Sequence, residues 1–200
     1  MWQRMAIATA GILIAGLVVS ACGASSTVSK ASSSSATTAT SQATTATQVQ
    51  KADLYLVVLT GKMLQKPGWP AVYPADFTVP GNTDVTVTVR NYDDGTAPVT
   101  ATYGKVTGTV GGSEQVNGKT VTSIDPAQVS HTITVNSLSL NIPIPPATSN
   151  GPSVVVFTFH TPAKGTYIWQ CMAPCGSGTD GWGGAMMTDG WMKGTITVSA

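Results

Sequence analysis

The sequence predicts an all-β fold, an antiparallel β-sandwich, and three observations support this. Residues 84–90 alternate strictly between valine and polar side chains, which is typical of a strand with one face against a core. Other short runs rich in β-branched and aromatic residues are separated by turn residues such as Gly81 and Asn82. No run in residues 51–200 shows sustained helical periodicity. Short strands joined by turns are typical of a sandwich.

The expected strands are short runs spread over the C-terminal three quarters of the chain. They cover residues 52–59, 77–80, 84–90, 130–135, 154–159, 166–170 and 195–198. The first is apolar and β-branched, and most of the later ones alternate between apolar and polar residues. Residues 92–125 are Gly-rich and less regular, so we expect either a hairpin or a long excursion from the sandwich there.

The N-terminal part has the composition of an export signal followed by a tether. Arg4 precedes an uncharged tract, residues 5–21, which is short for a membrane span and ends in small residues, as a cleaved signal peptide does. In residues 23–50, 15 of 28 residues are Ser or Thr, and burial cannot offset the entropy of ordering such a segment. We therefore expect a signal peptide over 1–21, a disordered tether over 22–50 and one domain over 51–200.

The signal tract ends in Val19, Ser20, Ala21 and Cys22, which resembles the lipobox of bacterial lipoproteins. That resemblance implies cleavage before Cys22 and a lipid on Cys22, which would anchor the protein to the outer face of the cell membrane. The alternatives are an ordinary signal peptide followed by an unmodified cysteine, or an uncleaved anchor helix. Each of them exports the domain to a compartment where disulfide bonds persist.

The composition excludes several classes of function. The 200-residue chain has 10 Lys and Arg against 9 Asp and Glu, so it has no basic field to neutralise phosphates, and nucleic acid is not an expected partner. Two histidines and three cysteines argue against a zinc protease or a multi-histidine metal cluster. No nucleophile has an evident base and orienting residue, and no phosphate-binding or dinucleotide motif occurs. We therefore expect that the chain is not an enzyme.

Donors that suit copper occur beside the expected strands. Cys171 and Cys175 follow the run 166–170, His131 begins another run, and Met192 precedes the last one. Sulfur ligands favour Cu(I), and one imidazole keeps Cu(II) accessible, so this set suits copper. The alternative role of the two cysteines is a disulfide that closes a short loop.

The domain also resembles the cupredoxins, and within them the copper-binding domain of cytochrome c oxidase subunit II. The motifs that carry the resemblance are residues 129–135, 142–146 and 157–167, and then Gln170-Cys171-x3-Cys175-Gly176. The closing run Met192-Lys193-Gly194-Thr195-Ile196-Thr197-Val198 is similar to that of small blue copper proteins, in which the axial methionine precedes the last strand. The resemblance implies a Greek-key sandwich and one copper ion held by His131, Cys171, Cys175 and Met192. It also implies one-electron transfer with a redox protein or terminal oxidase at the membrane. The likeness to an oxidase subunit concerns the domain alone and implies no oxidase activity of this chain.

The sequence departs from the oxidase pattern at two ligand positions, so a dinuclear copper centre is not expected. Thr179 stands where the dinuclear site has a histidine, and Trp182 stands where it has a methionine. His160 does not replace the missing ligand, because strand alternation turns it away from Phe157 and Phe159 and places it far from Cys171. We expect His160 at the surface.

Several neighbouring residues have a structural alternative to a role at the metal. Trp169 precedes Cys171 on the same strand face, where we expect a core tryptophan beneath the site. Met172, Met186 and Met187 are further thioether donors, and packing is the alternative for each.

Three functions stay open on the sequence alone. The first is electron transfer through one copper, which the order of His131, Cys171 and Met192 favours. The second is a copper carrier for oxidase assembly, because two cysteines and one histidine form the ligand set of some copper-delivery proteins. The third is a metal-free structural or interaction domain with a Cys171–Cys175 disulfide.

Overall fold

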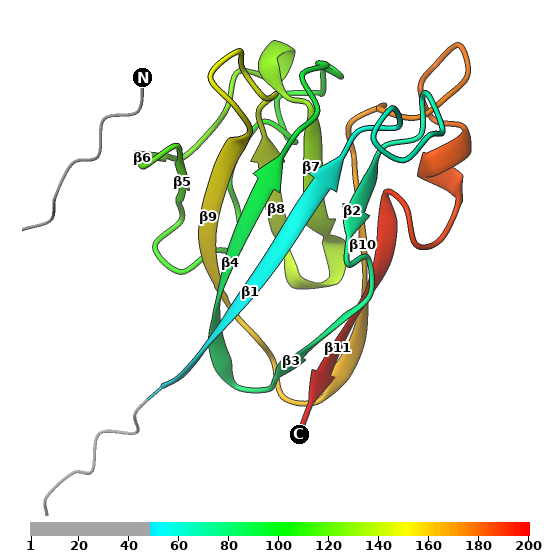
Figure 1. Cartoon of the computed structure of the whole chain (residues 1–200). Coiled ribbons are helices and arrows are strands. Elements are labelled where there is room, and N and C mark those ends of the chain that lie inside the picture. The colour runs from blue at the N-terminus through cyan, green and yellow to red at the C-terminus, as the bar shows by residue number, and fades with distance from the viewer. Residues whose placement is uncertain (1–48) are drawn as a thin grey trace, which may run out of the picture. The chain divides into compact units, whose positions relative to one another are not determined.

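The structure is a computed structural model, and it describes residues 49–200 (Figure 1). These residues form two β-sheets. The predicted β-sandwich is therefore confirmed. The signal peptide, Cys22 and the tether up to residue 48 lie outside the described residues. Within residues 49–200, no helix combines the length and the apolar character needed to cross a membrane.

Each sheet combines strands from distant parts of the chain. The first sheet has the order β2 (Ala71–Tyr73), β1 (Gln50–Leu59), β4 (Thr83–Asn91), β9 (Ser153–His160), β5 (Glu114–Val116) and β6 (Lys119–Val121). The second has the order β3 (Phe77–Pro80), β11 (Lys193–Ser199), β10 (Gly165–Gln170), β7 (His131–Val135) and β8 (Leu140–Ile144). Three short 3₁₀ helices complete the elements of residues 49–200: η1 (Pro126–Gln128), η2 (Asn136–Leu138) and η3 (Gly184–Met187).

The sheets are not purely antiparallel, which corrects one detail of the prediction. β1 pairs with β4 in parallel, and β3 pairs with β11 in parallel. The chain leaves the first sheet after β2, enters the second sheet through β3 and then returns as β4. Because no hairpin joins β1 to β4, β4 can run in the same direction as β1.

Alternation along the strands places the core between the sheets. In β4 the valines are buried, and the polar residues between them are more exposed, as the sequence predicts. Phe157 and Phe159 of β9 face the same core, and Ile133 of β7 and Ile196 of β11 contribute from the second sheet. This core holds the two sheets together and gives the site a rigid support.

The strands that the sequence analysis did not predict are β2, β5, β6 and β8. Each of the two options for residues 92–125 describes part of the segment, because residues 92–113 contain no strand, whereas β5 and β6 then pair as a hairpin and β5 joins β9. Asn117 and Gly118 at its turn have φ of 49° and 80°, as a two-residue type I′ turn requires. All five residues of β8 are buried, so β8 has no alternation by which to recognise it.

Candidate metal centre

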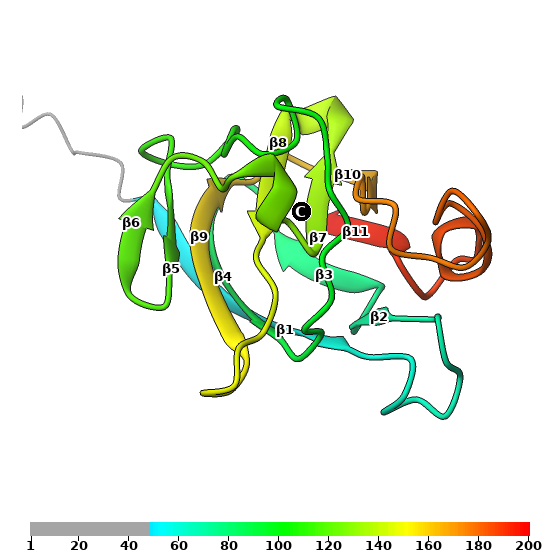
Figure 2. The same ribbon diagram turned by 90° about the horizontal axis from the view of Figure 1, so that it is seen from above.

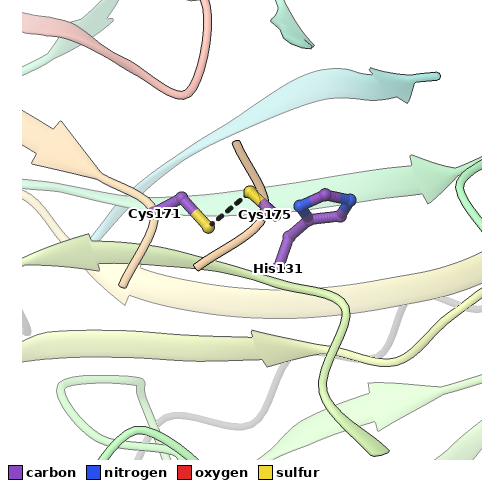
Figure 3. Close-up of side chains that lie close together, drawn as sticks. All are labelled: His131, Cys171 and Cys175. Atoms are coloured by element: carbon purple, nitrogen blue, oxygen red, sulfur yellow. Dashed lines mark hydrogen bonds between the residues drawn. The ribbon is translucent and has the colours of Figure 1, made fainter. Parts of the chain in front are cut away.

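Three of the four predicted ligands meet at one end of the second sheet. Cys171 follows β10 directly, Cys175 lies in the next turn, and His131 is the first residue of β7. One donor atom of each residue lies within 4.8 Å of the donor atoms of the other two. Figure 3 shows the two sulfur atoms facing each other with the imidazole beside them. The convergence arises because β10 and β7 are antiparallel neighbours.

Backbone hydrogen bonds hold Cys171 from both sides. The N–H of Thr132 in β7 donates to Cys171 Sγ at 3.3 Å, and the hydroxyl of Thr132 accepts the N–H of Met172 at 2.8 Å. On the other side, the N–H of Cys171 donates to the carbonyl of Met192 at 2.9 Å. Cys171 is fully buried, so its thiol sits in a fixed position away from bulk water.

The two thiols are free and lie 3.5 Å apart, Sγ to Sγ. Cys175 is half-buried, and its Sγ lies 3.4 Å from the Sδ of Met186. The Sγ of Cys175 therefore contacts both the Sγ of Cys171 and the Sδ of Met186.

Met186 makes the thioether contact with the cysteine pair, and it was only an alternative candidate in the sequence analysis. It lies in η3 and is fully buried. Met192 is also buried, and its carbonyl accepts a hydrogen bond from the N–H of Cys171. The role of its thioether as a copper ligand stays a prediction. Met187 is 68% exposed and Met172 is half-buried. Four methionines lie near one another in the sequence, and no local signal distinguishes Met186.

His131 is buried, with 1% of its surface exposed, and its two ring nitrogens have different surroundings. Nε2 lies 3.1 Å from Oδ2 of Asp93. Nδ1 is buried and has no hydrogen-bond partner among the described residues. Figure 3 shows a ring nitrogen of His131 turned toward the sulfur atoms. Sequence reasoning missed Asp93, which lies in the irregular segment after β4 beside another aspartate, Asp94.

The charges of these groups are coupled. Burial lowers the pKa of His131, but the hydrogen bond to Asp93 and the interaction with Cys171 outweigh it and raise the pKa to about 9. Burial raises the pKa of Cys171, but the hydrogen bond from Cys175 and the nearby charge of His131 bring it well below its usual value. The hydrogen bond with Cys171, and then burial, raise the pKa of Cys175. Burial also opposes ionisation of Asp93, yet its hydrogen bond with His131 lowers its pKa. This arrangement favours ionisation of Cys171 over ionisation of Cys175.

The remaining residues singled out in the sequence lie away from this cluster or serve the core. His160 is exposed, as predicted, and its Nδ1 lies 2.8 Å from Oδ1 of Asp84 on the neighbouring β4. Trp169 is fully buried, as predicted, and its Nε1–H donates to the carbonyl of Ala75 at 2.7 Å. Thr179 and Trp182 are both exposed.

The donors fit a copper ion. Two cysteine sulfurs, one imidazole nitrogen and a nearby thioether are ligand types that suit copper, whereas hard cations such as Mg²⁺ and Ca²⁺ are bound by oxygen ligands. A buried ring nitrogen without a hydrogen-bond partner costs free energy, and a metal at Nδ1 would remove that cost. His131, Cys171 and Cys175 would hold the ion, and Met186 is the thioether nearest to Cys175.

A surface hollow reaches the cluster beside Cys175 and His131. Its other lining residues come from the segment after β4, the start of β7 and the segment after β10: Asp93, Gly95, Thr96, Ala97, Ser130, Pro174 and Gly176. Seen from above in Figure 2, the orange segment after β10 coils outward beside β11. Solvent therefore has access to Cys175, whereas Cys171 is enclosed.

No protein-family model and no curated protein sequence matches the chain. The solved structures to which the chain is similar include rusticyanin and auracyanin B. One is rusticyanin, described as a copper protein, at 18% identity over 76% of this chain and 80% of that chain, with a TM-score of 0.37. Another is rusticyanin from Thiobacillus ferrooxidans, at 17% over 76% and 79%, with a TM-score of 0.39. A third is auracyanin B, at 17% over 78% and 94%, with a TM-score of 0.33.

The resemblance of the sequence motifs to oxidase subunit II stays an expectation.

Proposed function

We propose that this protein binds one copper ion through His131, Cys171 and Cys175, with a thioether as a further ligand, and carries single electrons. The observation that supports this is the convergence of an imidazole and two thiols within 4.8 Å at the end of a β-sandwich. Copper would supply a reversible one-electron change between Cu(I) and Cu(II). The partner would be a redox protein or a terminal oxidase at the membrane, reached through a lipid on Cys22.

The residues around the site are suited to electron transfer. Cys171 is held between β7 and β11 by hydrogen bonds to Thr132 and Met192, so the ligands are placed before a metal binds. Trp169 and the core exclude water from the inner side of the cluster. A rigid, largely dry site needs little rearrangement when its charge changes by one.

A copper carrier is the second candidate, and the position of Cys175 favours it. This cysteine is half-buried and lines the surface hollow together with His131. A thiol of a partner protein entering there would meet Cys175 first, and ligand exchange between thiols is the usual route for passing on Cu(I). The carrier and the electron-transfer protein differ in whether copper leaves the site.

The test is copper binding by the full-length chain, purified in mild detergent with its thiols reduced. We expect one copper per chain, with an intense visible band from thiolate-to-copper charge transfer after addition of Cu(II). Cys171→Ser and His131→Asn should abolish this band. The matched controls are Cys22→Ser and His160→Asn, which remove a cysteine and a histidine that are not among the proposed ligands and should leave the band unchanged.

Each other outcome has a definite meaning. Cu(I) binding without the band, followed by transfer of copper to a small thiol chelator, would establish the carrier instead. Failure to bind copper while Cys171 and Cys175 are lost as a disulfide would overturn the proposal and make this a metal-free domain. The anchor is tested separately by mass spectrometry of the mature N-terminus, where an unmodified Cys22 would exclude lipid attachment at that residue.

A further inference from the structure

Asp93 follows a strand of one sheet and His131 begins a strand of the other, yet their side chains meet. Asp93 lies just beyond β4 of the first sheet, and His131 begins β7 of the second. The Oδ2 of Asp93 is 3.1 Å from the Nε2 of His131. The contact is sheltered, because the side chains of His131 and Asp93 are only 1% and 22% exposed. An ion pair this sheltered is weakly screened by solvent.

A network of hydrogen bonds fixes the carboxylate of Asp93. The N–H of Gly95 donates to Oδ1 at 3.0 Å, which leaves Oδ2 for His131. The N–H of Asp93 donates to Oδ1 of Asn91 at 2.9 Å. Asn91 is fully buried, and its amide donates to the carbonyl of Pro145 at 2.9 Å and to that of Asp93 at 3.2 Å. The carboxylate is therefore anchored to the loop between β8 and β9 as well as to its own turn.

This anchoring determines which ring nitrogen of His131 is available. A carboxylate only accepts hydrogen bonds, so Nε2 keeps its hydrogen when it faces Asp93. Nδ1 is then the nitrogen that gives up its proton to a metal, on the side of Cys171 and Cys175, where it has no hydrogen-bond partner among residues 49–200. A carboxylate behind a metal-bound histidine orients the ring and makes it a better donor.

We propose that Asp93 is a positioning residue, which orients His131 so that Nδ1, and not Nε2, binds the metal. This inference rests on the proposed copper site. Asp93 does not itself contact the metal. Its effect passes through the hydrogen bond to Nε2, so loss of the carboxylate weakens a ligand without removing it.

The test compares Asp93→Ala and Asp93→Asn with the matched control Asp94→Asn in the full chain. Asp94 is the adjacent aspartate and is exposed. Cu(I) affinity is measured by competition with a coloured chelator. We expect Asp93→Ala to weaken binding roughly 10- to 100-fold, as for other carboxylates behind metal-bound histidines. Asp93→Asn should fall between Asp93→Ala and the wild type, because its amide oxygen still accepts from Nε2–H. Asp94→Asn should bind as the wild type does.

Two further readouts separate positioning from a merely structural role. In the Cu(I) form, the Nε2–H proton of His131 should give a slowly exchanging NMR signal that Asp93→Ala loses. The reduction potential should rise in Asp93→Ala, because a less basic imidazole stabilises Cu(II) less. If Asp93→Ala does not fold, the nearly isosteric Asp93→Asn carries the same comparison, and the melting temperatures of the metal-free variants show whether it is intact.

The failures are distinguishable. If the wild type binds copper and neither Asp93 variant changes affinity, potential or the His131 signal, this inference is overturned and the proposed function stands. An affinity loss that is matched by a lower melting temperature of the metal-free protein, with the NMR signal and the potential unchanged, also overturns it. If the wild type does not bind copper, the proposed function fails and the inference fails with it.

Discussion

The Sδ of Met186 lies 3.4 Å from the Sγ of Cys175, and both belong to the segment between β10 and β11. Hydrogen bonds within this segment fold it back on itself. The N–H of Gly176 donates to the carbonyl of Gly181 at 2.7 Å, and Ser177 and Gly183 form a two-residue bridge. A side chain at Gly176 would overlap the carbonyl of Gly183 and the side chain of Met186, so the close packing there requires glycine.

Replacing Met186 with leucine should change the copper site, whereas the same change at Met187 should not. Met186 is buried against Cys175, and its neighbour Met187 is 68% exposed. Leucine keeps the packing volume but lacks the sulfur donor. We expect Met186→Leu to shift the visible band and weaken Cu(I) binding several-fold, as measured by absorption and chelator competition.

Met192→Leu decides between the two buried thioethers. An unchanged band in Met186→Leu together with an altered band in Met192→Leu would show that Met192 is the ligand that the sequence predicts. The melting temperatures of the copper-free variants serve as the control for packing damage.

Thr132→Val should destabilise the turn that carries the cysteines. The hydroxyl of Thr132 is buried, and it accepts the N–H of Met172 at 2.8 Å. Valine has the same shape but leaves that N–H without its partner, which costs about 1–3 kcal/mol. Urea unfolding of the copper-free protein measures the loss. Thr197→Val, on the exposed face of β11, is the control and should change the free energy of unfolding by less than about 0.5 kcal/mol. Equal stability of the two variants would contradict this.

Glu114 should make the stability of the protein depend on pH. It is 2% exposed, both carboxyl oxygens have no hydrogen-bond partner among the described residues, and burial raises its pKa from 4.5 to about 8. Between these two values the folded protein keeps a proton that the unfolded chain has released. The free energy of unfolding therefore falls as pH rises through this window and levels off above it.

Glu114→Gln should remove the contribution of Glu114 to this dependence and stabilise the protein above the pKa of Glu114. A gain of a few kcal/mol is expected, because the amide does not ionise, and each unit by which burial raises the pKa of Glu114 corresponds to about 1.4 kcal/mol. Thermal unfolding of both proteins at a series of pH values measures it. Asp53→Asn, at an exposed position of β1, is the control variant. If the free energy of unfolding of the wild type does not change between pH 4.5 and about 8, Glu114 does not make the stability depend on pH.

Strands that alternate were predictable because alternation is a property of consecutive residues. Residues 84–90 and 154–159 fall within β4 and β9, with the predicted residues facing the core. β8 escaped prediction because it is buried throughout, and β2 because it has only three residues. The parallel pairing of β1 with β4 depends on how the chain crosses between sheets, which no local pattern records.

The sequence by itself determined the fold class, and it singled out the three candidate donors that the fold brings together. The spacing of Cys171 and Cys175 after a strand, and the position of His131 at the start of another, are visible in the chain. Only the tertiary structure decided which thioether meets Cys175 and which carboxylate faces His131. Met186 reaches Cys175 through the fold of an irregular loop, and Asp93 reaches His131 from the other sheet. Contacts between distant residues depend on packing and chain crossing, whereas strand alternation depends on near neighbours alone.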